Sequence, residues 1–316
     1  MGILNKQYQT SGAGIAKNGS KKKGAALFFE LFFRKFWLLI EVNMLYSLFF
    51  MPLMLALVCM STKLLSTTAS LVAVIAFSLL FMVIIGPATA GMITILRKYT
   101  LEKHAFILSD FFKSFKQNFK NAAIIGFADC ILILSTISGI IIYPTNAAAY
   151  GKVMYFFFAV VIAVAITVTI MNFYIFPMIV ATDLSLANII KNAFALTCIA
   201  LKKNAVTFLI TVLIYGIFAF LILFVNLIFA LILPFFPVAI VSFIQCFNSY
   251  PVIQKYIINP YYENLGVSNP ELGDGDIDDE ATPIFEDKGG SEAPVDISGK
   301  EKTVEKRNKS KGKIIS

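Results

Sequence analysis

The sequence predicts an all-α fold: a polytopic membrane helix bundle of about six transmembrane helices with two cytoplasmic amphipathic helices. Hydrophobic residues make up 58% of the 316 residues and charged residues only 15%, with a mean hydropathy of +0.78. Soluble domains are usually about half apolar and a quarter charged. The apolar residues are gathered in runs of about 20, the length that crosses a bilayer. Lysine and arginine cluster between alternate runs, as in cytoplasmic loops.

The N-terminal part predicts a basic arm followed by an interfacial helix. Residues 1–24 are polar and carry several lysines, so we expect a flexible basic arm. In residues 25–37, Glu30 and Arg34 lie one helical turn apart among Leu and Phe side chains. That pattern is typical of a helix at the membrane surface, which would lead into the first span.

Six apolar stretches within a transmembrane domain, residues 25–260, are expected to cross the bilayer. The last two are inferred from one almost uncharged run of 41 residues, 205–245, about twice the length of a span. If that run were one long tilted helix with a re-entrant piece, the count would be five. The expected spans lie near residues 37–59, 68–87, 122–143, 153–177, 205–224 and 228–250.

The distribution of cations predicts the orientation of these spans. The N-terminal approach and the connections after the second and fourth spans are rich in Lys and Arg, whereas the turn after the first span carries only Lys63. The outer loop expected at residues 144–152 carries only Lys152. Because cytoplasmic loops hold the excess of cations, both chain ends are expected in the cytoplasm. We therefore expect a multi-pass protein of a bacterial-type inner membrane.

Residues 110–120 predict a helix along the cytoplasmic membrane surface. Phenylalanines recur at helical spacing on one side and lysines share the other. The rings would enter the acyl boundary while the ammonium groups stay among anionic lipid headgroups. A second, less regular helix of this kind is expected between residues 183 and 204. The residues of the first are Phe111, Phe112, Lys113, Phe115, Lys116, Phe119 and Lys120.

A motif of small residues lies where the second span ends. Gly86 and Gly91 let neighbouring helices approach closely, Pro87 removes a backbone donor, and the Thr89 hydroxyl can bond a freed carbonyl. The functional interpretation is a hinge or a cavity wall. A packed kink is favoured, because proline and glycine are ordinary in membrane helices.

Asp129 is the most informative ionisable residue. An acid at the centre of a span costs about 2.5–3.5 kcal/mol, so Asp129 is expected to face the bundle and to be paired or protonated. Asn43, Asn172 or Asn226 could supply a donor. Asn43 and Glu41, one turn inside the first span, complete a candidate intramembrane polar site, but snorkelling of these side chains toward the cytoplasmic headgroups is the favoured alternative. Helix–helix hydrogen bonding is favoured over an ion or substrate site.

The remaining sequence argues against an enzyme. No HExxH, GxSxG or glycine-rich phosphate loop occurs, and the single histidine leaves little acid–base chemistry. We therefore expect no catalytic residue, no cofactor and, since no CxxC pair occurs, no metal site. The cations lie beside apolar runs, which favours lipid over nucleic acid. Residues 261–316, acidic and then basic, are expected to form a disordered cytoplasmic tail, with a docking site for a partner as the alternative.

Two stretches resemble a known family. One is Phe33-Arg-Lys-Phe-Trp-Leu-Leu-Ile-Glu-Val-Asn43, continuing to Pro52; the other is Gly86-Pro87-Ala88-Thr89-Ala90, followed by Arg97-Lys98 and Asp110-Phe111-Phe112. Over about residues 30–125 the chain resembles the YesL-like integral membrane proteins, although Met44-Leu45-Tyr46 stands where that family usually has Leu-Leu-Trp.

The resemblance implies a domain of unknown function that is often encoded beside carbohydrate uptake or sensing components. It supplies no catalytic or binding residues. The expected function is therefore a non-enzymatic accessory or regulatory component whose partner is a permease or sensor subunit. The alternative is a small-solute transporter or channel with Asp129 in its cavity.

Overall fold

The computed structural model describes residues 23–61, 66–233 and 235–271, and all regular secondary structure in these ranges is helical. Most of the basic arm expected at residues 1–24 lies outside the described residues. So do the turn that carries Lys63 and most of the tail expected at 261–316.

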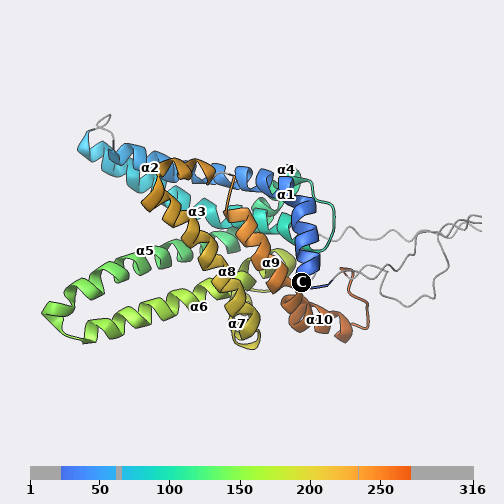
Figure 1. Ribbon diagram of the computed structural model, residues 1–316. Helices are drawn as coiled ribbons and strands as arrows, with labels where there is room; N and C mark the ends of the chain where they lie inside the picture. Colours follow the sequence, from blue (N-terminus) through green and yellow to red (C-terminus); the bar gives the residue numbers. More distant parts are fainter. Residues whose placement is uncertain (1–22, 62–65, 234, 272–316) are drawn as a thin grey trace, which may run out of the picture.

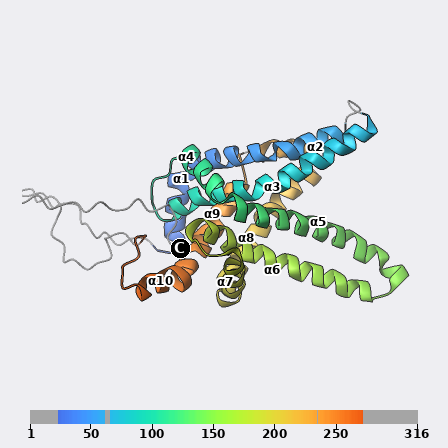
Figure 2. The same cartoon turned by 180° about the vertical axis from the view of Figure 1, so that it is seen from behind.

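The first helical hairpin is longer than predicted. The interfacial helix and the first span form one apolar stretch, Ala25–Ser61, of 37 residues. Its first turns run at an angle to the rest (Figures 1 and 2), as an interfacial approach requires. The return helix continues through Pro87, which costs only one helical hydrogen bond. The elements are α1 (Ala25–Ser47), the short helix η1 (Leu48–Phe50), α2 (Met51–Ser61) and α3 (Thr67–Thr100).

The second hairpin follows a short amphipathic helix, α4 (Ile107–Gln117). α4 ends at Asn118, whose side-chain amide donates back to the Ser114 carbonyl at 3.1 Å. Phe119 and Lys120, predicted to belong to this surface helix, therefore lie in the first turn of α5 (Phe119–Tyr150). The outer loop expected from residue 144 is helical almost to its end, because α5 continues through Pro144 and stops at Gly151, where φ is 84°. The return helix is α6 (Val153–Ala181).

The third hairpin is interrupted on its return. It rises from a second amphipathic helix, and its outward helix ends in a π-helical turn before Asn226. The return consists of a short 3-10 helix and, after residues 233–237, a separate α-helix. The elements are α7 (Leu186–Ile199), α8 (Leu201–Phe220), η2 (Leu221–Val225), η3 (Leu227–Ile232), α9 (Val238–Ile253), η4 (Gln254–Ile258) and α10 (Asn259–Asn264).

Five described helices are long and apolar enough to cross a membrane. The sixth span, expected near residues 228–250, is not one continuous helix, because α9 begins only at Val238. The count of five agrees with the five-span alternative, since Leu201–Val225 is one long stretch of 25 residues and is followed by two shorter helices, η3 and α9. The five stretches are Ala25–Ser61, Thr67–Thr100, Phe119–Tyr150, Val153–Ala181 and Leu201–Val225.

The bundle is organised around the crossing of α3 and α5. A Cβ atom on Gly86 would lie 2.0 Å from the Ala122 carbonyl oxygen, and one on Gly126 would lie 2.5 Å from the Cα of Gly86. Only hydrogen fits at either position, so the two backbones touch there. The start of α1, α4 and α10 lie at one end of the bundle, and the end of α2, the start of α3 and the α5–α6 connection lie at the other (Figures 1 and 2).

Candidate functional site

Asn43 lies against the break in the last hairpin. Its side-chain Nδ2 donates to the Leu233 carbonyl at 3.0 Å, and its Oδ1 accepts from the Ala239 backbone N–H at 2.8 Å. The Leu233 carbonyl precedes the break. The Ala239 N–H lies in the first turn of α9, where backbone N–H groups have no acceptor within the helix. Asn43 is 2% exposed. One buried amide on α1 therefore satisfies backbone groups on both sides of the interruption.

Asp129 is paired with a different asparagine. The Asn172 Nδ2 donates to the Asp129 Oδ1 at 2.8 Å, which joins α5 to α6. Of the three donors considered from sequence, Asn172 is thus the one the fold brings to the carboxyl group. The Asn172 Oδ1 is buried and has no hydrogen-bond partner among the described residues.

The three residues of the candidate intramembrane polar site do not share a hydrogen-bond network. Asn43 bonds to the α9 region and Asp129 to α6. Glu41 has an exposed side chain on α1, which agrees with the snorkelling alternative. The fold therefore separates these residues into two helix-joining contacts and one exposed carboxylate.

The small-residue motif is a packing surface. Gly86 and Pro87 are buried, with Gly86 against Ala122 of α5. Gly91 lies under the Phe111 ring, because a Cβ there would be 3.1 Å from two of its ring carbons. The Thr89 hydroxyl donates to the Ile85 carbonyl at 2.9 Å and lies 3.0 Å from the Tyr46 hydroxyl of α1.

The phenylalanines of α4 divide between the protein interior and the surface. Phe111 is fully buried and stacks on Phe49, with ring centroids 5.5 Å apart. Phe115 contacts the same ring at 5.4 Å. Phe112 is 42% exposed, and the lysines at 113, 116 and 120 are all exposed. α4 therefore packs against the bundle through Phe111 and Phe115. Its exposed face carries Phe112 together with Lys113 and Lys116.

A buried ion pair joins α3 to the end of the described chain. The Arg97 Nη1 lies 3.8 Å from the Glu271 Oε1, with side chains 8% and 5% exposed. The Glu271 Oε2 accepts from the Tyr250 hydroxyl at 2.6 Å and from the Gln254 Nε2 at 3.1 Å. The Arg97 guanidinium lies over the Tyr250 ring, 5.7 Å from its centroid. Residues up to 271 thus belong to the fold, although a tail was predicted from residue 261.

Sequence reasoning missed this cluster for a specific reason. Glu271 opens an acidic block and Arg97 stands in a basic connection, so each was assigned to a solvated charge run. One signal was present: Tyr250 and Gln254 lie one turn apart, near the end of α9 and at the start of η4, and such polar groups need partners when they are buried. Within the described ranges, no group of three or more His, Cys, Asp or Glu side chains lies close enough to hold a metal ion.

The arrangement defines a class of protein: an integral membrane helix bundle with amphipathic helices and buried polar contacts at one end. Residues 31–143, from α1 into α5, match the family described as "Protein of unknown function, DUF624". The match leaves the third hairpin and the tail uncovered. No curated protein and no solved structure matches the chain. The comparisons therefore support a membrane protein that contains a domain of unknown function.

Proposed function

We propose that this protein is a non-enzymatic accessory or regulatory membrane subunit, associated with carbohydrate uptake or sensing as the YesL-like resemblance implies. One observation carries the proposal: the polar side chains of its membrane helices hold the protein's own helices together. Asn43 joins α1 to the break before α9, and Asp129 joins α5 to Asn172 of α6. A transported solute would have to displace these bonds, whereas a scaffold keeps them.

The charge distribution supports an orientation with α4 and α10 in the cytoplasm. The end of the bundle that holds these helices carries most of the described cations, and the opposite end carries Lys152 among the described residues. By the positive-inside rule the cation-rich end faces the cytoplasm. The cations at that end include Arg34, Lys35, Arg97, Lys98, Lys103, Lys113, Lys116, Lys120, Lys202, Lys203 and Lys255.

The exposed face of α4 is where a permease or sensor subunit would bind. Phe112 and the neighbouring lysines are exposed there, while Gly86 and Gly91 are covered by α5 and Phe111. The small-residue motif is thus not available to a partner. An exposed aromatic ring surrounded by cations suits a partner with an apolar pocket and an acidic rim.

Photo-crosslinking in native membranes tests this proposal. A photoreactive amino acid in place of Phe112 is expected to link the protein to one permease or sensor subunit, which mass spectrometry identifies. The same amino acid in place of Phe111, which is fully buried, is the matched control and is expected to give only internal products. Products at position 112 that contain only a second copy of this chain would contradict the accessory function. Products that contain only lipid would contradict a partner at this face and would agree with the membrane-surface helix predicted from the sequence.

A small-solute transporter is the second candidate. The observation in its favour is the buried Asn172 Oδ1, which lies next to the Asp129 carboxyl group and has no hydrogen-bond partner among the described residues. Uptake into vesicles by the wild type and by Asp129→Asn distinguishes the two functions. A solute whose uptake requires the wild-type protein and falls in the folded variant would favour the transporter; unchanged uptake of every tested solute agrees with the accessory function.

A further inference from the structure

A groove of about 740 Å³ lies beside α9, between α1 and the start of α8. α9 packs against both of these helices and forms the floor. Most of the lining side chains are apolar, and two lysines, Lys23 and Lys203, lie at the end near α10. None of the described lining residues is acidic. Among the described residues, the groove therefore combines an apolar wall with a positive end that has no acid in its lining.

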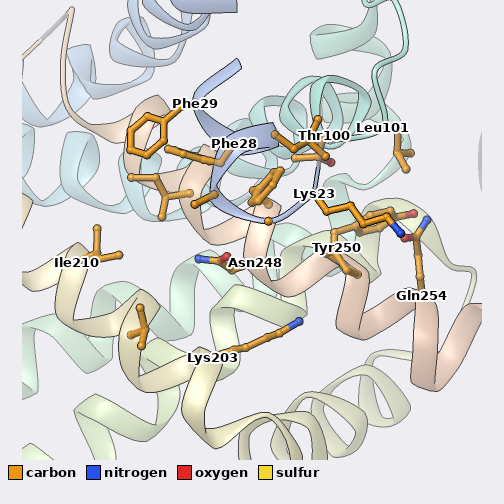
Figure 3. A pocket seen from close by; sticks show the side chains of 17 residues that line it. Lys23, Phe28, Phe29, Thr100, Leu101, Lys203, Ile210, Asn248, Tyr250 and Gln254 are labelled. Atoms are coloured by element: carbon orange, nitrogen blue, oxygen red, sulfur yellow. The ribbon is translucent and has the colours of Figure 1, made fainter. Parts of the chain in front are cut away.

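Its polar and apolar parts are separated along the direction of the helices. Figure 3 shows the tips of Lys23, Lys203 and Gln254 on one side of the groove and Phe29 and Ile210 on the other. Ile210 is seven residues beyond Lys203 on α8, which corresponds to about 10 Å at 1.5 Å per residue. Because α8 is one of the membrane-crossing helices, the lysines lie toward its surface end and Ile210 lies deeper.

Neither lysine is held by an acid of the described part of the chain. Both are exposed, and neither forms a salt bridge with another described residue. Glu271, which bonds to Tyr250 and Gln254 of the groove, also forms an ion pair with Arg97. The mouth of the groove is flanked by the exposed side chains of Phe29 and Val206, each 55% exposed.

We infer that this groove binds an anionic phospholipid of the surrounding bilayer, with its headgroup phosphate at Lys23 and Lys203 and an acyl chain along Phe28, Ile210 and Ile244. The lysines lie at the depth of the headgroups and complement the negative charge of such a lipid, and the apolar walls below them complement its acyl chains. A soluble anion would not use the apolar walls. A zwitterionic lipid would bring a cation beside its phosphate, and the two lysines would repel that cation. The inference does not depend on the accessory function.

Native mass spectrometry of the full chain released from detergent tests this inference. The probes are phosphatidylglycerol and phosphatidylcholine with identical acyl chains, and glycerol 3-phosphate, which has the anionic group without the chains. We expect phosphatidylglycerol to bind in preference to the other two. The double variant Lys23→Gln/Lys203→Gln is expected to bind it about 25-fold more weakly, at roughly fivefold per lysine.

Two further variants separate a specific site from general charge. Ile210→Trp keeps both lysines but fills the apolar end, and is expected to reduce phosphatidylglycerol binding. Lys103→Gln/Lys152→Gln removes the same charge at two exposed positions outside the groove and is expected to leave binding unchanged. Equal binding of the two lipids, an equal loss in this control, or tight glycerol 3-phosphate binding would each overturn the inference.

Discussion

The side-chain oxygen of Asn43 accepts a hydrogen bond from the backbone N–H of Ala239 at 2.8 Å, although 196 residues separate the two in sequence. Ala239 lies in the first turn of α9, where backbone N–H groups have no partner within the helix. In a bilayer such groups must be satisfied by protein. A membrane protein can therefore interrupt a helix at this depth because a distant helix supplies the missing partner.

Asn43→Ala is expected to destabilise the bundle. The change leaves the Ala239 N–H and the Leu233 carbonyl without their side-chain partner, and the loss is about 1–3 kcal/mol for two such bonds. Thermal unfolding in detergent measures it. Asn146→Ala is the control, because the Asn146 amide bonds only to the Ile142 carbonyl of its own helix. Equal effects of the two substitutions would show that Asn43 does not hold the break.

Gly86→Ala is expected to separate α3 from α5. The new Cβ would be 2.0 Å from the Ala122 carbonyl oxygen, which is backbone and cannot rotate away. Overpacking of this kind costs about 1–3 kcal/mol. Gly216→Ala is the matched control, since a Cβ there meets no atom within 4 Å. If Gly86→Ala were as stable as this control, close packing of α3 on α5 would not explain Gly86, and the hinge interpretation would be favoured.

Glu271→Gln is expected to loosen the C-terminal segment from the bundle. The substitution leaves the buried Arg97 guanidinium unpaired, which typically costs about 3–5 kcal/mol. Hydrogen exchange of residues 259–271 and thermal unfolding measure the effect. The double variant Arg97→Met/Glu271→Met removes both charges and is expected to recover much of the loss.

Another ion pair provides the control for that experiment. Arg34 and Glu102 form an equally polar pair at 2.9 Å, but their side chains are 45% and 47% exposed. Exposed pairs contribute about 0–1 kcal/mol, so Glu102→Gln is expected to change little. If Glu271→Gln were equally mild, the Arg97 pair would not anchor the segment.

The sequence predicts the membrane helices better than it predicts where they end and what they contact. Apolar runs of spanning length predicted the membrane bundle because length and hydropathy decide whether a segment enters lipid. The same measures could not place the end of α5, since Pro144 removes one donor without ending a helix. They also did not foresee the break before α9, because the run from 205 to 245 is almost uncharged and its prolines, Pro234 and Pro237, are a residue type that membrane helices also tolerate.

Partners distant in sequence were harder to predict than the residues themselves. Asp129 was expected to face the bundle and to bind a neighbouring helix, but three asparagines were equivalent donors until the register of α6 against α5 placed Asn172 beside it. The same limit applies to Glu271. Its burial depends on the chain turning back toward Arg97 after α10, where Gly266 has a φ of 66°. A glycine predicts the end of a helix, but it does not predict which distant residue the following acid will contact.

Phe111→Ala and Phe112→Ala are expected to differ strongly, although the residues are adjacent. Phe111 is fully buried on Phe49 and over Gly91, and removing such a ring costs about 3–5 kcal/mol. Phe112 is 42% exposed, so its removal is expected to cost less than about 1 kcal/mol. Thermal unfolding of both variants measures the difference. Similar losses would mean that α4 does not dock through Phe111.

Reporter fusions give the last prediction, which concerns the orientation of the bundle. A reporter inserted at Gly151, in the turn between α5 and α6, is expected to read as external. Reporters placed at Lys103 and after Tyr262 are expected to read as internal, because the cations near α4 and α10 hold that end in the cytoplasm.

The reading after Tyr262 is decisive for the third hairpin. η3 and α9 are separate helices, and neither alone has the length of a span. Together they bring the chain from the outer end of α8 back to α10, which lies at the same end as α4 (Figures 1 and 2). An internal reading therefore means that a broken segment completes a sixth crossing, with Asn43 holding the break. An external reading, with Lys103 still internal, would mean that the chain crosses five times and that the return through α9 does not occur in the membrane.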